Sequence, residues 1–240
     1  MALKILIIAA THGNEPIGPR FYSYLLSKRA DLLENVELII GNPRAFAKRV
    51  RYIESDLNRS YQIGKSTYEQ RRANEIEEYV KFTKPDLVID MHSTACIQPR
   101  IMIVRNLHSQ MVKRFLRNCH VEKVLKVTTT NDSASITPHM IAYEVMNRDV
   151  NQSLFADIAD DIDKFLADSI NTSSKLTYQM TGKIYKSDVT KEQARTLVNF
   201  EMNPLGFIPI MTGNNSYKKQ TDYLGFKAET QERVILKKSN

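Results

Sequence analysis

The chain has 240 residues, of which 42% are hydrophobic and 25% charged, and its formal net charge is +7. This composition is that of a globular domain with a sizeable core, and it excludes a disordered or collagen-like chain. The longest apolar run, residues 5–10, is too short to span a membrane and is not followed by a signal-peptide cleavage site. Because the only cysteines are Cys96 and Cys119, no disulfide framework beyond one bridge is possible, and we expect a cytoplasmic protein.

The basic residues are scattered along the chain and are not interleaved with aromatic residues on a recognisable binding motif. We therefore expect a solvated basic surface, without a nucleic-acid or membrane partner. A second interpretation stays open, in which some of the arginines hold a small anionic substrate.

The first half of the chain alternates apolar runs with helical patterns. Pro16 is tolerated in the first turn of a helix, and the apolar run before it is typical of a parallel strand that is buried on both faces. The pattern predicts strands at 3–10, 36–41, 87–91 and 100–104, and helices at 16–28, 68–82 and 109–118. This alternation indicates an α/β fold with a largely parallel central sheet flanked by helices.

After about residue 120 the pattern changes. We expect strands at 121–130 and 136–145 and an amphipathic helix at 151–170. Beyond that helix, turn signals separate short β-like segments at 176–184, 197–201, 208–211 and 233–237. The sequence thus predicts two parts, a catalytic domain over 1–172 and a small β-rich C-terminal domain over 173–240.

Candidate metal ligands follow two of the predicted strands. His12 and Glu15 lie three residues apart after the first strand, and His92 follows the strand at 87–91. Carboxyl ends of parallel strands meet at one sheet edge, so these side chains are expected to converge there. Two histidines and a carboxylate leave one position of a tetrahedral zinc ion open, as in catalytic sites, and Asp90 would orient a ligand. A His-x-x-Glu pair by itself is also a common turn feature.

Polar residues that suit an anion lie between these ligands. Arg44 follows the second strand, and its planar guanidinium fits a carboxylate or a developing oxyanion. Asn58 and Arg59 are adjacent and together suit a substrate carboxylate. The same residues also fit ordinary roles, Arg44 as a surface cation and residues 56–59 as a helix cap.

Four motifs in this order carry a resemblance to a known family. They are His12-Gly13-Asn14-Glu15, Asn42-Pro43-Arg44-Ala45, Asp56-Leu57-Asn58-Arg59 and Asp90-Met91-His92-Ser93-Thr94. The series resembles the aspartoacylase/succinylglutamate desuccinylase family of the zinc carboxypeptidase superfamily, as does the run from residue 49 to 59. The resemblance is specific over residues 4–95, and it implies a zinc-carboxypeptidase-like fold.

The resemblance also implies roles for particular residues. His12, Glu15 and His92 would bind one zinc ion per chain, and Glu144 would be the general base. Arg44 would polarise the scissile carbonyl, and Asn58 and Arg59 would bind the carboxylate of the amino-acid part. Tyr217, in a segment similar to one that closes over the substrate, would contact the substrate.

The sequence also departs from the family. Where aspartoacylases have an arginine for the side-chain carboxylate of N-acetylaspartate, this chain has Ala134, close to Asp132. A carboxylate at that place repels a second carboxylate. Arg148 is a candidate substitute for the arginine, and the C-terminal part is shorter than in typical members.

These observations together predict a zinc-dependent amidohydrolase that deacylates a small N-acylated amino acid, with a possible homo-oligomeric state. Two alternatives stay open. One is a zinc carboxypeptidase-type peptidase, since the superfamily uses the same metal ligands. The other is a non-catalytic module that binds an anion through its arginines.

Overall fold

The computed structural model describes residues 2–128, 131–213 and 221–238. Its strands are β1 (Ile5–Ala9), β2 (Val36–Ile40), β3 (Leu87–Thr94), β4 (Ile101–Val104), β5 (Lys123–Lys126), β6 (Met140–Met146), β7 (Thr172–Tyr185), β8 (Ile208–Ile210) and β9 (Tyr223–Lys237). Its α-helices are α1 (Ile17–Lys28), α2 (Pro43–Lys48), α3 (Tyr68–Thr83), α4 (Gln110–Asn118), α5 (Gln152–Ala167) and α6 (Lys191–Thr196).

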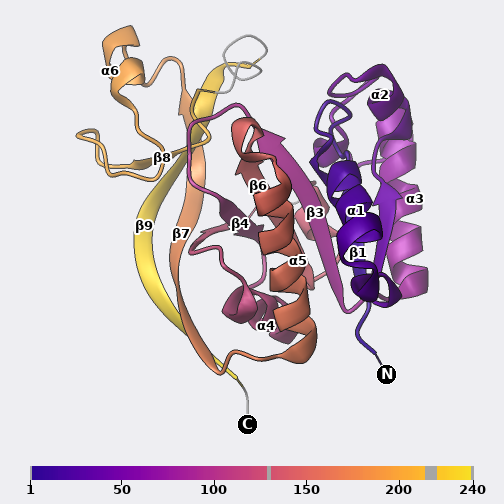
Figure 1. The fold of residues 1–240 in the computed structure, drawn as a ribbon. Coiled ribbons are helices and arrows are strands. Elements are labelled where there is room, and N and C mark those ends of the chain that lie inside the picture. Colours follow the sequence, from indigo (N-terminus) through magenta and orange to yellow (C-terminus); the bar gives the residue numbers. More distant parts are fainter. Residues whose placement is uncertain (1, 129–130, 214–220, 239–240) are drawn as a thin grey trace.

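The described strands form one sheet in the order β2-β1-β3-β6-β4-β5-β7-β9-β8 (Figure 1). The pairs β2–β1, β1–β3, β3–β6, β4–β5 and β5–β7 are parallel. Strand β4 runs antiparallel to β6, and β9 runs antiparallel to both β7 and β8. The predicted fold class, a mixed and largely parallel sheet with flanking helices and a strand-rich C-terminal part, is confirmed. The predicted boundary near residue 172 falls at the start of β7, which pairs with β5.

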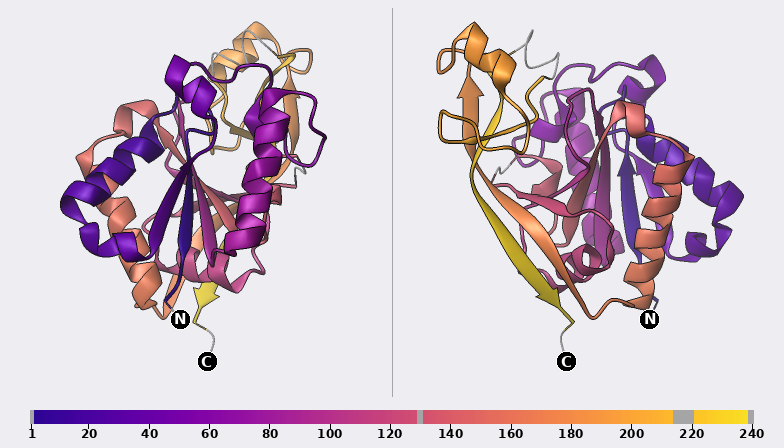
Figure 2. Two further views of the ribbon diagram at one scale, coloured as in Figure 1. Left: turned by 90° about the vertical axis from the view of Figure 1, so that its right-hand side faces the viewer. Right: turned by 60° about the vertical axis from the view of Figure 1, so that its left-hand side comes forward.

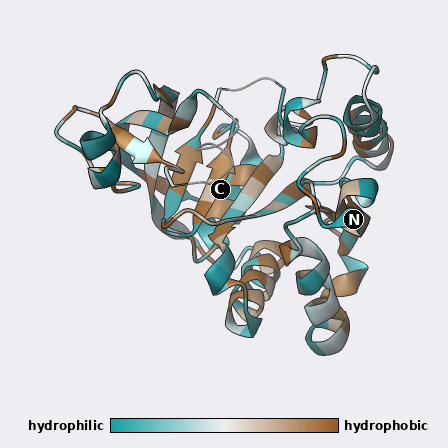
Figure 3. Cartoon of the chain, turned by 90° about the horizontal axis from the view of Figure 1, so that it is seen from above, coloured by the Kyte–Doolittle hydropathy of each residue, from teal (hydrophilic) through white to brown (hydrophobic). Residues whose placement is uncertain are grey.

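Helices cover the two faces of the sheet unequally (Figure 2). On one face α1, α4 and α5 pack together over the sheet, and their apolar residues form the largest core cluster. On the other face α3 packs over β1 and β3, through contacts that include Ile76 and Leu6. A separate apolar cluster on β4, β5 and the C-terminal strands lies beside it. Figure 3 shows hydrophobic residues concentrated in the central strands, whereas the helices carry both hydrophobic and hydrophilic residues.

Several elements differ from the sequence-based expectations. The predicted strand at 197–201 is wrong, because residues 199–200 form a turn in which Phe200 has a φ of 68°. Phe200 is buried although it lies in a turn, and its ring packs edge-on against Tyr178. The sequence analysis did not predict the short helices α2 and α6, and β9 starts ten residues before the predicted strand at 233. None of the helices in the described ranges has the length and hydropathy of a membrane-spanning segment.

The loop after β1 lies tightly against α2. Asn42 caps α2 by accepting a hydrogen bond from the backbone N–H of Ala45, and Pro43 occupies the first helical position. A Cβ atom on Gly13 would lie 2.1 Å from the backbone carbon of Ala45. Glycine is therefore required at position 13 for this close approach between the loop and the helix.

We expect the substitution Gly13→Ala to lower the free energy of unfolding by about 1–3 kcal/mol, because the added methyl group forces the loop away from α2. Gly182→Ala is the matched control, since a Cβ there would meet no atom within 4 Å. The control should change stability by no more than about 0.5 kcal/mol. Urea unfolding of both variants measures the difference, and equal effects would contradict the packing argument.

Candidate metal and hydrolase site

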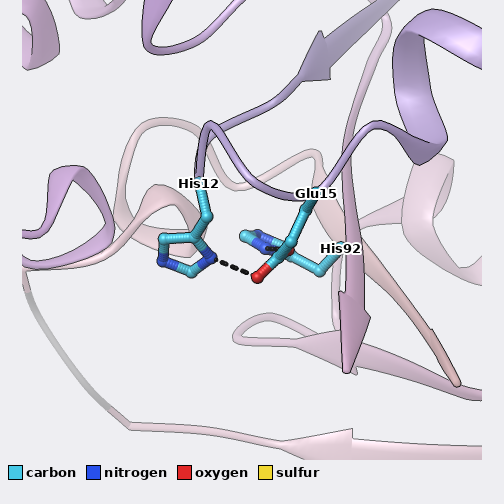
Figure 4. Close-up of side chains that lie close together, drawn as sticks. All are labelled: His12, Glu15 and His92. Atoms are coloured by element: carbon cyan, nitrogen blue, oxygen red, sulfur yellow. Dashed lines mark hydrogen bonds and ion pairs between the residues drawn. The ribbon is translucent and has the colours of Figure 1, made fainter. Parts of the chain in front are cut away.

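Three potential metal ligands meet at the carboxyl ends of β1 and β3. His12 and Glu15 come from the loop after β1, and His92 lies on β3, which pairs in parallel with β1. His12 Nδ1 lies 2.8 Å from Glu15 Oε1, and His92 Nδ1 lies 3.1 Å from Glu15 Oε2 (Figure 4). One ligand atom from each residue lies within 4.8 Å of the others, and all three residues are buried. This buried donor set fits a zinc ion.

Two further carboxylates hold the opposite nitrogens of the histidine rings. His12 Nε2 lies 3.0 Å from Asp56 Oδ1, and His92 Nε2 lies 2.9 Å from Asp90 Oδ2. Asp90 is fully buried and also accepts a 2.7 Å hydrogen bond from the hydroxyl of Thr11. Such carboxylates fix the orientation of metal-binding histidines. Sequence analysis singled out Asp90 for this role but not Asp56, which comes from a distant loop.

The histidines and carboxylates of this cluster shift each other's pKa values. Burial by itself lowers the pKa of His12, but the carboxylates of Glu15 and Asp56 outweigh burial and raise it above 6.5. Burial raises the pKa of Glu15, but the two histidines outweigh this effect and lower it. The pKa of His92 is raised in the same way by Asp90 and Glu15. The carboxylates are thus ionised, and a divalent cation would take the place of the protons on the imidazoles.

Glu144 lies on β6 directly beside the ligand His92. The two residues are register partners in the parallel pair of β3 and β6, so their side chains project from the same face of the sheet. Glu144 is 8% exposed and lines the same cavity as the ligands. Burial raises its pKa to about 7, against the opposing effect of the His92 charge. A buried carboxyl group with this pKa is suited to taking up and releasing a proton near neutral pH.

Two arginines line this cavity, Arg51 and Arg59, and Arg51 is the one that lies beside Glu15 and Asp56. Its Nη2 lies 2.9 Å from Asp56 Oδ2, and its Nη1 lies 3.7 Å from Glu15 Oε1. Arg44, which sequence analysis selected, lies exposed on α2 with its guanidinium 4.5 Å from the ring centre of Tyr68, and it does not line the cavity. The signal for Arg51 was its place within the run from residue 49 to 59 that resembles the family.

A buried carboxylate on α3 holds the segment that carries Arg51 and Asp56. Glu69 accepts hydrogen bonds from the backbone N–H groups of Ile53, Glu54 and Ser55, and from the side chain of Asn42. Burial raises the pKa of Glu69, but these donors outweigh burial and lower it below 4.5. The segment from 53 to 55 is therefore fixed through its backbone.

Asn58 and Arg59, which were predicted to bind a substrate carboxylate, both line the cavity. The Asn58 side-chain oxygen accepts a 2.9 Å hydrogen bond from the backbone N–H of Ser133, which leaves its amide N–H groups for a ligand. The Arg59 side chain is exposed and donates a 2.6 Å hydrogen bond to the Asn58 carbonyl. Asp132, Ser133 and Ala134 line the cavity next to Asn58.

Two other candidates are not part of the described cavity lining. Tyr217 falls in the segment 214–220, outside the described residues. Arg148 has a side chain that is 67% exposed, lies 3.9 Å from Asp149, and does not line the cavity. The structure therefore gathers His12, Glu15, His92, Glu144, Asn58 and Arg59, adds Arg51 and Asp56, and leaves Arg44 and Arg148 outside.

We expect Glu69→Gln to destabilise the protein by about 1.5–3 kcal/mol at pH 7, since hydrogen bonds to a charged acceptor are lost. The native pKa of Glu69 is lowered, so its contribution is complete above 4.5 and is lost as the pH falls through the native pKa. Urea unfolding at pH 7 and at pH 3.5 should therefore show a smaller difference between variant and native protein at the lower pH. Glu75→Gln is the control on the same helix, because the Glu75 side chain is 62% exposed. A pH-independent difference would contradict the charge argument.

The sequence of this chain is similar to those of a known protein family. The family model of the succinylglutamate desuccinylase/aspartoacylase catalytic domain matches residues 2–148. A probable aspartoacylase of Prochlorococcus marinus (strain MIT 9515) is 45% identical over 102 residues, which cover 38% of this chain and 34% of that protein. The match thus spans about a third of the curated relative's length.

Solved structures share the fold over nearly the whole chain. Murine aminoacylase 3 superposes with a TM-score of 0.75 at 19% identity, covering 98% of this chain and 97% of that one. The succinylglutamate desuccinylase from Chromobacterium violaceum gives a TM-score of 0.73 at 18% identity, covering 97% of this chain and 86% of that one. Because the family model covers well over half of the sequence, the chain belongs to the succinylglutamate desuccinylase/aspartoacylase family.

Proposed function

We propose that this protein is a zinc-dependent hydrolase that removes the acyl group from a small N-acylated amino acid. The proposal rests on one observation: the candidate zinc ligands and Glu144 line the same cavity. The buried ligands His12, Glu15 and His92 share this cavity with Glu144, whose pKa is about 7, and His92 and Glu144 are register partners on the neighbouring strands β3 and β6. Membership of a family named for deacylating enzymes supports the same reaction.

His12, Glu15 and His92 would hold the zinc ion, with Asp56 and Asp90 orienting the two rings. Zinc bound in such a site lowers the pKa of water and polarises a carbonyl group. Three protein ligands would leave the ion accessible to water or substrate, as in catalytic zinc sites.

The remaining roles belong to side chains of this chain. Glu144 would accept a proton from the attacking water and pass it to the leaving amine nitrogen as the amide C–N bond breaks. Arg51 would stabilise the negative charge that develops on the carbonyl oxygen. Asn58 and Arg59 would bind the carboxylate of the amino-acid part, Asn58 through the amide that Ser133 leaves available.

The peptidase and anion-binding alternatives predict different activities. A carboxypeptidase would also cleave short peptides, and an anion-binding module would bind its ligand without a metal. The pairing of Glu144 with a metal-ligand set favours catalysis, because an anion site gains nothing from a buried carboxylate. Homo-oligomerisation and a cytoplasmic location stay predictions from the sequence.

Amine release from a panel of N-acyl amino acids and short peptides tests the function. The zinc-loaded protein should hydrolyse N-acyl amino acids, and a chelator should abolish turnover. Glu144→Gln should lower kcat about 10²–10⁴-fold while zinc still binds at one per chain. The control is Glu122→Gln, at a side chain that is 58% exposed, and it should retain activity. Full activity of Glu144→Gln would rule out the assigned base.

Paired arginine variants test which guanidinium serves the reaction. Arg51→Lys should lower kcat about 10²–10³-fold, since the guanidinium beside Glu15 and Asp56 would face the developing charge. Arg44→Lys makes the same change at the exposed arginine on α2, and its kcat should stay close to that of the native protein. A larger loss at Arg44 than at Arg51 would restore the assignment made from the sequence.

A further inference from the structure

The cavity continues past Glu144 onto an apolar stretch of sheet. Ala142 on β6 is the register partner of Ile103 on β4, and Ile103 is the partner of Leu125 on β5. Partners on adjacent strands share a face, so these three residues form a continuous apolar row across the sheet. All three line the cavity, and Ala142 lies two residues before Glu144 on the same strand.

The C-terminal strands close this apolar end. Met180 on β7, Phe226 on β9 and Met211 after β8 line it, and all three pack in the same hydrophobic cluster as Leu125. The register between β7 and β9 shifts on both sides of Met180, an irregularity of the kind that redirects a side chain next to a site. Met211 has a φ of 56°, and its carbonyl accepts a hydrogen bond from the Cys96 thiol at 3.2 Å.

This end of the cavity is unsuited to a second carboxylate. Among the described residues that line the cavity, the cationic groups are Arg51, Arg59 and the two histidines, and none of them belongs to the apolar cluster that contains Leu125. Ala134 packs within the apolar cluster, and the neighbouring Asp132 brings a buried carboxylate to the cavity wall. Moving an ionised carboxylate into such surroundings costs free energy, and no cation among the described residues of this cluster offsets that cost.

We infer that the substrate carries a single carboxylate and an apolar group, and that Leu125, Met180 and Phe226 determine this specificity by enclosing the apolar group. The inference rests on the proposed function. The carboxylate lies at Asn58 and Arg59, and the apolar group lies across the sheet row beyond Glu144. That group is either an amino-acid side chain, such as that of leucine or methionine, or an acyl chain longer than acetyl.

Three substrates of the zinc-loaded protein separate these two sources, and two charged substrates test the inference itself. N-acetylleucine against N-acetylglycine tests an apolar side chain, and N-hexanoylglycine against N-acetylglycine tests an apolar acyl chain. At least one comparison should favour the apolar substrate tenfold or more in kcat/KM, because a few methylene groups in an apolar pocket give about that discrimination. N-acetylaspartate should be hydrolysed less well than N-acetylleucine. A preference for N-acetylaspartate or N-acetyllysine would overturn the inference and leave the deacylase function standing.

Binding gives a second measurement that does not depend on turnover. In titration calorimetry with the zinc-loaded protein, hexanoate should bind at least tenfold more tightly than succinate, with a negative heat-capacity change from apolar burial. If no N-acyl amino acid is hydrolysed, the proposed function fails, and this titration still decides the inference. Equal or tighter binding of succinate would overturn it.

A matched pair of methionine variants identifies the wall of the pocket. Met180→Ala should reduce the ratio of kcat/KM between the preferred apolar substrate and N-acetylglycine by about tenfold, mainly through KM, since the contact is equal in ground and transition states. Met202→Ala is the control, because Met202 is 60% exposed and does not line the cavity. Met180 is half-buried, so the variant should fold. An unchanged ratio in Met180→Ala would overturn its role in specificity.

Discussion

The parallel register of β1, β3 and β6 is the constraint on which the site depends. Ile8 pairs with Asp90, and His92 pairs with Glu144, so the ligand loop, the second histidine and the buried glutamate arrive at one sheet edge. A shift of one residue in either pair would turn the functional side chains to the opposite face, where α1 and α5 pack. The apolar core beneath the strands therefore fixes the chemistry as well as the fold.

Much of this centre was predictable from the sequence, for a physical reason. His12, Glu15 and His92 follow apolar runs that can only be buried strands, and parallel strands end at a common edge. The choice of arginine was not predictable in this way. Arg51 reaches the site because Glu69, on the later helix α3, accepts hydrogen bonds from the backbone of residues 53–55 and so fixes the loop next to Arg51. No local pattern around Arg44 or Arg51 shows that long-range contact.

In the C-terminal third, less of the structure was predictable from the sequence. Alternating residues indicate strands there, and the strand at 208–211 agrees closely with β8 (Ile208–Ile210). Alternation does not show, however, which strands pair with each other. The predicted strand at 197–201 is wrong, because a buried phenylalanine, here Phe200, also fits a turn. The role of Met180 depends on the register irregularity between β7 and β9, which appears only when both strands are paired. The apolar end of the cavity is thus a property of tertiary structure.

The hydrogen bond between Ser133 N–H and the Asn58 side chain has a consequence for how the specificity of this chain can change. It joins Asn58, which would bind the substrate carboxylate, to the segment 132–134, which lines the same cavity. Residues that share a contact do not respond independently to substitution. Replacements at 132–134 that move the backbone would also reorient Asn58, so evolutionary paths to a new specificity would be epistatic, with compensating changes near Asn58 required first.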